Sequence, residues 1–138
     1  MSQQNIDVVQ SGYAAFGRGD IPGLLALLDA GVEWKTPGTP DLPTAGTRRG
    51  HAEVAAFFGT LNEIIDFEHF EPQTFLADGD RVVVFGIDRL KVKGGSGQSL
   101  SEDWCHVFTV RGGKIVAFQE YIDTATLAAE LKTAAARV

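Results

Sequence analysis

The spacing of hydrophobic residues predicts helices in the first part of the chain. Apolar residues recur at helical spacing over residues 4–17, which predicts an amphipathic helix whose buried stripe contains Ile6, Val9, Tyr13 and Phe16. Asp20 is placed to cap a second helix, and Pro22 falls in the first turn, where its missing N–H is tolerated. The apolar run that follows predicts that this second helix continues to Gly31.

A segment rich in proline and glycine follows the first two helices. The triplet VEW at residues 32–34 predicts a short strand. The stretch KTPGTPDLPTAGTRRG, residues 35–50, predicts a long ordered loop, because proline and glycine interrupt helices and inner strands. A third helix is expected to begin near residues 50–51, with an apolar stripe formed by Val54, Phe57, Phe58 and Leu61.

The remainder of the chain predicts a run of strands. Residues 67–77 form an irregular strand, Asp78–Gly79 a hairpin turn, and residues 81–93 a long strand. Two further strands flank Gly112–Gly113, and a terminal helix begins at Asp123 or Thr124. Helices followed by an antiparallel meander predict the α+β class. We expect one domain over residues 1–138, in which a curved antiparallel sheet wraps around the N-terminal helices and encloses a cone-shaped pocket.

The two strands around the Gly-Gly turn place polar groups among aromatic ones. Alternation puts two sets of side chains on faces that are expected to line the interior, namely Trp104, His106 and Phe108 on the first strand and Phe118, Glu120 and Ile122 on the second. The turn can bring His106 and Glu120 side by side, provided that a bulge corrects their parity. A histidine beside a carboxylate can pass protons in either direction. The alternative is a polar pair satisfied within the core.

Composition narrows the classes of function. The net charge is −6 and there is no basic cluster, so nucleic acid is not an expected partner. Cys105 is the single cysteine and the three histidines are scattered, so we expect no metal site and no cofactor. No apolar run reaches the roughly 20 residues of a membrane helix, and the first residues do not resemble a signal peptide. A cytoplasmic protein without a membrane partner is therefore expected.

Three segments carry a resemblance to a known family: YAAFGRGDIPGLLALL, GTRRGHAEVAAFF and WCHVFTVRGGKIVAFQEYID. The chain resembles SnoaL-like proteins and their ketosteroid-isomerase-like relatives, which share the nuclear transport factor 2-like fold. The resemblance implies a pocket for a small hydrophobic molecule, with His106 and Glu120 as catalytic residues. It implies ligand contacts from Tyr13, Trp34, Trp104, Phe108, Phe118 and Ile122. For Tyr13 the alternative is a packed core residue.

The long strand at residues 81–93 is apolar on both faces, so its orientation depends on the resemblance. That resemblance implies that Val83, Phe85, Ile87 and Arg89 face the pocket. Phe85 and Arg89 are then ligand-binding residues, and Arg89 holds an anionic group or pairs with Glu120. The opposite phase places Asp88 inside. With the implied phase, the outer face of the sheet carries Val82, Val84 and Leu90, and a homodimer packed through that face is expected.

The resemblance also bears on the reaction. It places the base aspartate of ketosteroid isomerases at Trp34, their protonated aspartate at His106 and their tyrosine at Gly12, so steroid isomerisation is not expected. We therefore predict a small-molecule-binding protein that acts as a cofactor-independent acid/base enzyme of isomerase, cyclase or hydrolase type on a hydrophobic substrate. The alternative is a non-catalytic ligand-binding or dimeric interaction domain.

Overall fold

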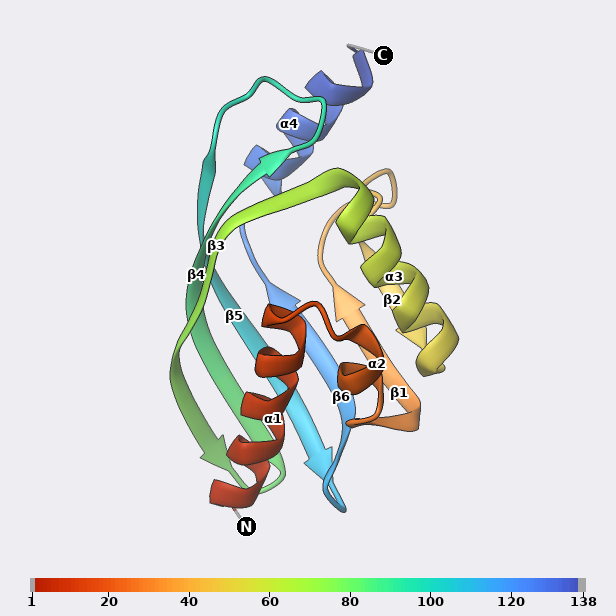
Figure 1. Cartoon of the computed structure of the whole chain (residues 1–138), viewed down its shortest axis with the longest axis vertical. Coiled ribbons are helices and arrows are strands. Elements are labelled where there is room, and N and C mark those ends of the chain that lie inside the picture. The colour runs from red at the N-terminus through yellow and green to blue at the C-terminus, as the bar shows by residue number, and fades with distance from the viewer. Residues whose placement is uncertain (1, 137–138) are drawn as a thin grey trace.

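The computed structural model describes residues 2–136, which form helices and a single mixed sheet (Figure 1). The helices are α1 (Ser2–Gly17), α2 (Ile21–Leu25), α3 (Gly50–Ile64) and α4 (Thr124–Ala136). The strands are β1 (Leu28–Thr36), β2 (Gly46–Arg49), β3 (Ile65–Asp78), β4 (Arg81–Val92), β5 (Leu100–Arg111) and β6 (Lys114–Tyr121).

The sheet has the order β2-β1-β6-β5-β4-β3 and is curved without closing on itself. Neighbouring strands are antiparallel except β1 and β6, which run parallel and place Trp34 beside Phe118. The helices α1, α2 and α3 lie over one face of the sheet, and α4 lies at the end where β3 begins (Figure 1). The predicted α+β class, with a curved sheet around N-terminal helices, is confirmed.

Two element boundaries differ from the sequence prediction. The second helix is capped by Asp20, whose side chain accepts a hydrogen bond from the Gly23 amide, but it ends at Leu25 instead of continuing to Gly31. The residues from Leu28 onward are recruited into β1, and Leu27 O, just before this strand, accepts a hydrogen bond from Ile115 N at 2.9 Å. The predicted loop at residues 35–50 also contains β2, which pairs with β1. In both places, pairing with a distant strand outweighs local preference.

The predicted orientation of β4 is wrong. Burial alternates so that Val82, Val84, Gly86, Asp88, Leu90 and Val92 face inward. Phe85 is 46% exposed, and Arg89 is exposed and lies 3.5 Å from a Glu68 carboxylate oxygen. Phe85 and Arg89 therefore cannot contact a ligand in the pocket, and Val82, Val84 and Leu90 cannot form an outer interface.

The cause of this orientation is the packing of Trp104 against Gly86. The two residues are directly opposite on β5 and β4. A Cβ at Gly86 would lie 2.2 Å from Trp104 Cζ2, so the indole fits only over a residue without a side chain. This contact fixes even-numbered β4 residues on the inner face.

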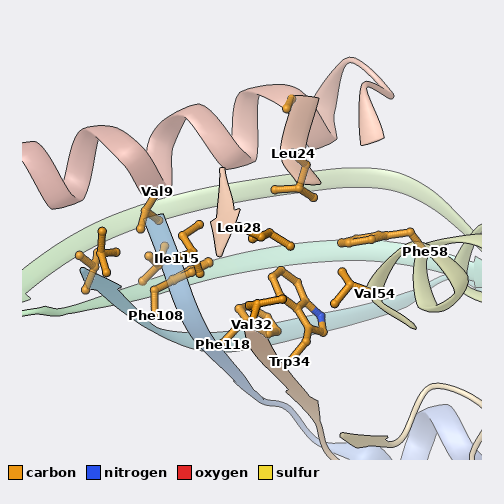
Figure 2. Packing of buried hydrophobic residues seen from close by; sticks show 14 of the residues in the cluster. Val9, Leu24, Leu28, Val32, Trp34, Val54, Phe58, Phe108, Ile115 and Phe118 are labelled. Carbon is orange, nitrogen blue, oxygen red and sulfur yellow. The ribbon is translucent and has the colours of Figure 1, made fainter. Parts of the chain in front are cut away.

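The main core lies between the helices and the sheet (Figure 2). Val9 of α1, Leu24 of α2 and Phe58 of α3 converge on the inner face of β1, β5 and β6. Trp34 stacks on Phe118, with ring centroids 3.9 Å apart. A smaller core under α4 contains Ile65, Leu90, Val92 and Leu127. The apolar stripe expected for the third helix supplies Val54, Phe57 and Phe58 to the main core.

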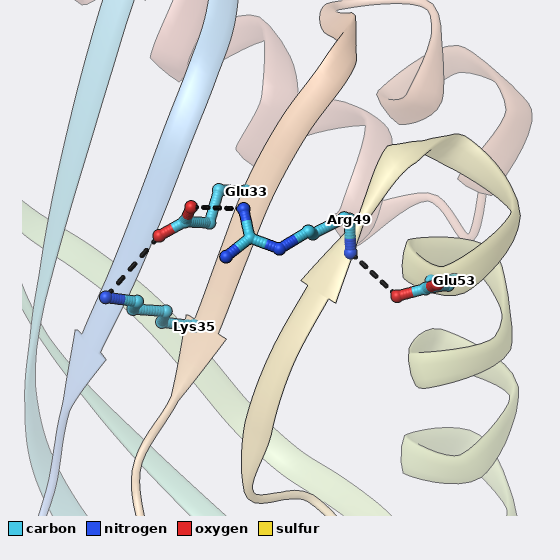
Figure 3. Close-up of polar contacts among 4 residues, drawn as sticks. All are labelled: Glu33, Lys35, Arg49 and Glu53. Carbon is cyan, nitrogen blue, oxygen red and sulfur yellow. Dashed lines mark hydrogen bonds and ion pairs between the residues drawn. The ribbon is translucent and has the colours of Figure 1, made fainter.

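A surface network ties the edge strand β2 to its neighbours (Figure 3). Glu33 lies 2.6 Å from Arg49 Nη1 and 3.4 Å from Lys35 Nζ, and the Arg49 amide donates to Glu53 at 2.9 Å. These ion pairs are exposed, and such pairs typically contribute about 0–1 kcal/mol each. The network orients β2 and the start of α3 more than it stabilises the fold.

Candidate functional site

A pocket opens between the inner face of the sheet and the helices. Its cavity volume is about 100 Å³. Since one water needs about 10–15 Å³ on this scale, the space corresponds to roughly seven to ten waters, or a molecule of one or two rings. The wall is mostly apolar, and its polar side chains are Tyr13, Thr36, Thr44, Asp88, Glu102, His106 and Glu120.

His106 and Glu120 meet in this pocket as the sequence predicted. They are directly opposite on β5 and β6, and the register shift between Thr109 and Val110 supplies the bulge that their parity requires. His106 Nε2 lies 3.0 Å from Glu120 Oε2. The His106 side chain is buried, with the residue 5% exposed, whereas Glu120 is partly open to the pocket.

Tyr13 completes a chain of hydrogen bonds that the sequence did not predict. Its hydroxyl oxygen lies 2.6 Å from His106 Nδ1. Burial, assisted by the negative charge of Glu120, raises the pKa of Tyr13, so the phenol keeps its proton at neutral pH. The protonated hydroxyl can donate to Nδ1, and in the imidazole tautomer that accepts this bond the ring proton is on Nε2, which faces the Glu120 carboxylate. We call this chain of Tyr13, His106 and Glu120 the proton relay.

Aromatic rings hold the imidazole of the relay in place. Trp104 stacks on the His106 ring, with centroids 4.0 Å apart and planes inclined by 19°. Phe118 approaches the same ring edge-on at 4.8 Å. The predicted residues Tyr13, Trp34, Phe108, Phe118 and Ile122 all line the pocket, whereas Trp104 is buried and supports the relay without lining it.

Because Gly86 makes room for Trp104, we expect Gly86→Ala to lower the free energy of unfolding by about 1–3 kcal/mol, the usual cost of overpacking. The new methyl would also lie 2.6 Å from Glu71 O, a backbone atom that cannot move aside cheaply. Urea denaturation measures the effect. Gly59→Ala in α3 is the matched control, since nothing lies within 4 Å of its Cβ position, and it should leave stability equal or higher. Equal midpoints for both variants would contradict the packing argument.

A second polar group in the pocket consists of two acids, Asp88 and Glu102. They are directly opposite on β4 and β5, and both line the pocket. Burial, followed by the charges of Glu102 and Glu120, raises the pKa of Asp88 to about 8. Burial is also the main cause of the raised pKa of Glu102. The pair, which we call the acid pair, therefore holds a proton at neutral pH.

Alternation on β5 could have indicated Glu102, one member of the acid pair. Glu102 precedes Trp104 and His106 at two-residue spacing, which puts it on the same face of β5. Asp88 follows from the alternative orientation of β4, which the sequence had left open. Arg48 fixes the loop that precedes α3 against the pocket wall. It donates to Thr36 Oγ1 at 2.6 Å and to Thr44 O at 3.1 Å, and it stacks over Phe57.

The structure also bears on metals and membranes. Among residues 2–136, no group of three or more His, Cys, Asp or Glu side chains is arranged to hold a metal ion. Within the same residues, no helix combines the length and apolar character needed to cross a membrane. The site is thus described by the relay, the acid pair and the apolar wall between them.

The fold and site define a class that sequence comparison confirms: the chain belongs to the SnoaL-like family, whose domain model matches residues 9–118. It is 40% identical to an NTF2-like protein of Burkholderia xenovorans LB400, with a TM-score of 0.84 and coverage of 94% of this chain and 97% of that one. An NTF2-like protein of Burkholderia pseudomallei K96243 is 34% identical, with a TM-score of 0.85 and coverage of 94% and 98%.

A third similar structure was obtained with a small molecule present. TerC, co-crystallised with polyporic acid, is 30% identical, with a TM-score of 0.84 and coverage of 94% of this chain and 98% of that chain. No curated protein sequence matches this chain significantly. The comparisons therefore establish the family and the nuclear transport factor 2-like fold.

Proposed function

We propose that the chain binds a small, largely apolar molecule of one or two rings and transfers a proton on it without a cofactor. The observation that carries this proposal is the buried imidazole of His106, which is hydrogen-bonded through both ring nitrogens inside an apolar pocket. If His106 and Glu120 were only a polar pair satisfied within the core, there would be no reason for both side chains to line a cavity. The co-crystallisation of TerC with polyporic acid supports a small organic ligand.

Each member of the relay has a distinct part in this proposal. Glu120 uses Oε2 for the hydrogen bond with His106, which leaves Oε1 to accept a proton from the substrate. His106 donates to the carboxylate, and Tyr13 fixes the imidazole in the required tautomer. The apolar wall limits the water around the base, so that the abstracted proton can return to another atom of the same substrate or exchange with solvent through the side of Glu120 that is open to the pocket.

We expect Glu120→Gln to abolish proton transfer while ligand binding is retained. The chain should accelerate the exchange of the acidic C–H protons of phenylacetone for deuterium in D₂O, as followed by NMR. Loss of the base should lower this rate by about 10²–10⁴-fold, the usual contribution of general acid–base catalysis. Binding of the same ketone, measured by its effect on the protein's NMR spectrum, should change little.

Two outcomes would contradict the proposal. An unchanged exchange rate in Glu120→Gln would remove the relay from the chemistry. Binding of phenylacetone without any acceleration of exchange by the unmodified protein would favour the alternative function, a non-catalytic ligand-binding domain. Asp103→Asn on the outer face of β5 is the matched control, because it makes the same charge change away from the pocket.

We also propose that the chain forms a homodimer through an apolar strip on the outer face of β4 and β5 that does not include Asp103. Val83 lies opposite Val107 and Phe85 opposite Cys105, which forms an apolar strip on the face away from the helices. An uncharged strip can face its own copy across a two-fold axis without bringing like charges together. Sedimentation should give a dimer at micromolar concentration and a monomer for Phe85→Asp. A monomeric unmodified protein would refute this proposal.

A further inference from the structure

The acid pair is not required by the proton relay, yet it is built into the wall of the same pocket. Asp88 is 7% exposed, and its Oδ1 is buried without a hydrogen-bond partner among the residues that the structure describes. A buried polar atom of this kind costs free energy unless something in the cavity satisfies it. Trp34, which also lines the pocket, has a buried indole N–H in the same condition.

The two polar groups lie apart along the sheet. The backbones of Glu102 and His106 are separated by four positions on β5, roughly 13 Å at about 3.3 Å per residue, although the charge of Glu120 still acts on both members of the acid pair. Trp104 lies between them on the same strand face and contributes no polar atom to the pocket wall. A ligand that reaches both groups therefore needs an apolar body and a polar function at a second position, away from the atom that Glu120 deprotonates.

The charge of the pocket limits what that polar function can be. In the described part of the chain, the lining includes three acids and no lysine or arginine. Arg48, which lies nearby, is occupied by Thr36 and by backbone carbonyls. A carboxylate ligand would meet Asp88, Glu102 and Glu120 with no lysine or arginine in the described lining to balance its charge.

We propose that the acid pair of Asp88 and Glu102 is the recognition site for an uncharged carbonyl oxygen, to which it donates a hydrogen bond, and that the pocket excludes carboxylate ligands. The inference rests on the proposed function, because it assigns the substrate class of the same pocket. The raised pKa of Asp88, about 8, supports it: burial, the charge of Glu102 and a hydrogen bond with Glu102 raise this pKa, so that the pair keeps a proton at neutral pH that a ligand oxygen can accept in place of Glu102.

Four probes of one ring test this assignment: acetophenone, ethylbenzene, benzoate and benzylamine. Their binding near pH 7 is measured by NMR, with the indole N–H signals of Trp34 and Trp104 as reporters. Acetophenone should bind about five- to tenfold more tightly than ethylbenzene, which matches one net hydrogen bond. Benzoate should bind most weakly. Tighter binding of benzylamine than of acetophenone would overturn the proposal, because the pair would then be an ionised site for cations.

The variant Asp88→Leu should equalise the affinities for acetophenone and ethylbenzene, while Asp103→Leu on the outer face leaves their ratio unchanged. If Asp88→Leu does not fold, the same ratio is measured in the unmodified protein about 1.5 pH units above the pKa of Asp88, about 8. Ionisation of Asp88 beside Glu102, Glu120, His106 and Asp123 should remove the preference there. A preference that survives both changes would overturn the proposal.

The failure of this inference differs from that of the proposed function. Equal affinity of acetophenone and ethylbenzene in the unmodified protein, with deuterium exchange still dependent on Glu120, would refute only the role of the acid pair. Absence of any effect of the four probes on the Trp34 signal would refute the ligand pocket, and both proposals with it.

Discussion

The free energy of unfolding should fall as the pH rises from about 5 to about 8, with a loss on the order of 3–5 kcal/mol. The cause is Asp88, whose pKa is raised in the folded chain from 3.8 to about 8, mainly by burial. Between pH 3.8 and about 8, Asp88 is ionised in the unfolded chain but keeps its proton in the folded chain. Each rise in pH within this range therefore favours unfolding. The raised pKa of Glu102 acts in the same direction.

Other carboxylates do not cancel this trend. Asp20, Glu33, Asp41, Glu68 and Glu71 have lowered pKa values because of hydrogen bonds and nearby basic groups. Their contribution is present above their ordinary pKa values and is lost at more acidic pH. These carboxylates are at the surface and are fully ionised above about pH 5. Above that pH, the acid pair therefore dominates the pH dependence of the free energy of unfolding.

Urea denaturation at about pH 5 and about pH 8 measures the effect. Asp88→Asn should be more stable than the unmodified chain at the higher pH and should flatten the dependence, because the amide cannot ionise. Asp103→Asn should keep the original slope, since that side chain faces solvent. A slope that is identical in all three proteins would show that Asp88 is ionised in the folded state.

Phe118→Ala should lower the free energy of unfolding by about 3–5 kcal/mol, the usual cost of removing a buried ring from a core. Phe118 is 5% exposed and stacks on Trp34 at 3.9 Å between centroids. It also packs against His106 and Phe108. The cavity left behind would join the pocket and loosen the imidazole of the relay.

Thermal and urea denaturation, together with the combined fluorescence of Trp34 and Trp104, measure this change. Tyr121→Ala provides a control on the same strand, because Tyr121 is 52% exposed on the other face. It should change stability by no more than about 0.5 kcal/mol. A small effect of Phe118→Ala would mean that the pocket wall collapses freely, which is incompatible with a preformed cavity.

The relay illustrates what sequence can and cannot predict in this chain. The pairing of His106 with Glu120 follows from two-residue alternation and a Gly-Gly turn, which are local properties. The hydrogen bond from Tyr13 depends on how α1 packs across the sheet, and no spacing rule contains that geometry. Tyr13 was predicted to contact a ligand in the pocket, but its hydrogen bond with His106 was not predicted.

The orientation of β4 shows a different limit. Its apolar residues fall on both faces, so periodicity gave no preference, and the orientation taken from the family resemblance was wrong. Charge offered a better guide, because Arg81, Arg89, Lys91 and Lys93 occupy odd-numbered positions and Asp88 is the single charged residue at an even one. Four basic side chains on a buried face would be far costlier than one protonated acid. Comparing the cost of burying the charged side chains on each face would have placed Asp88 inside the pocket, opposite Glu102.

The parallel pairing of β1 with β6 has a consequence for how the chain folds. Trp34 and Phe118 meet across this pairing, although more than half of the chain lies between them in sequence. Long loops must close before such contacts form, which slows folding in proteins dominated by non-local pairing. During synthesis on the ribosome, β1 and its partner β2 cannot join the rest of the sheet until β6, the last strand, has emerged. Until then Trp34 lacks its stacking partner, so the pocket is among the last parts of the molecule to assemble.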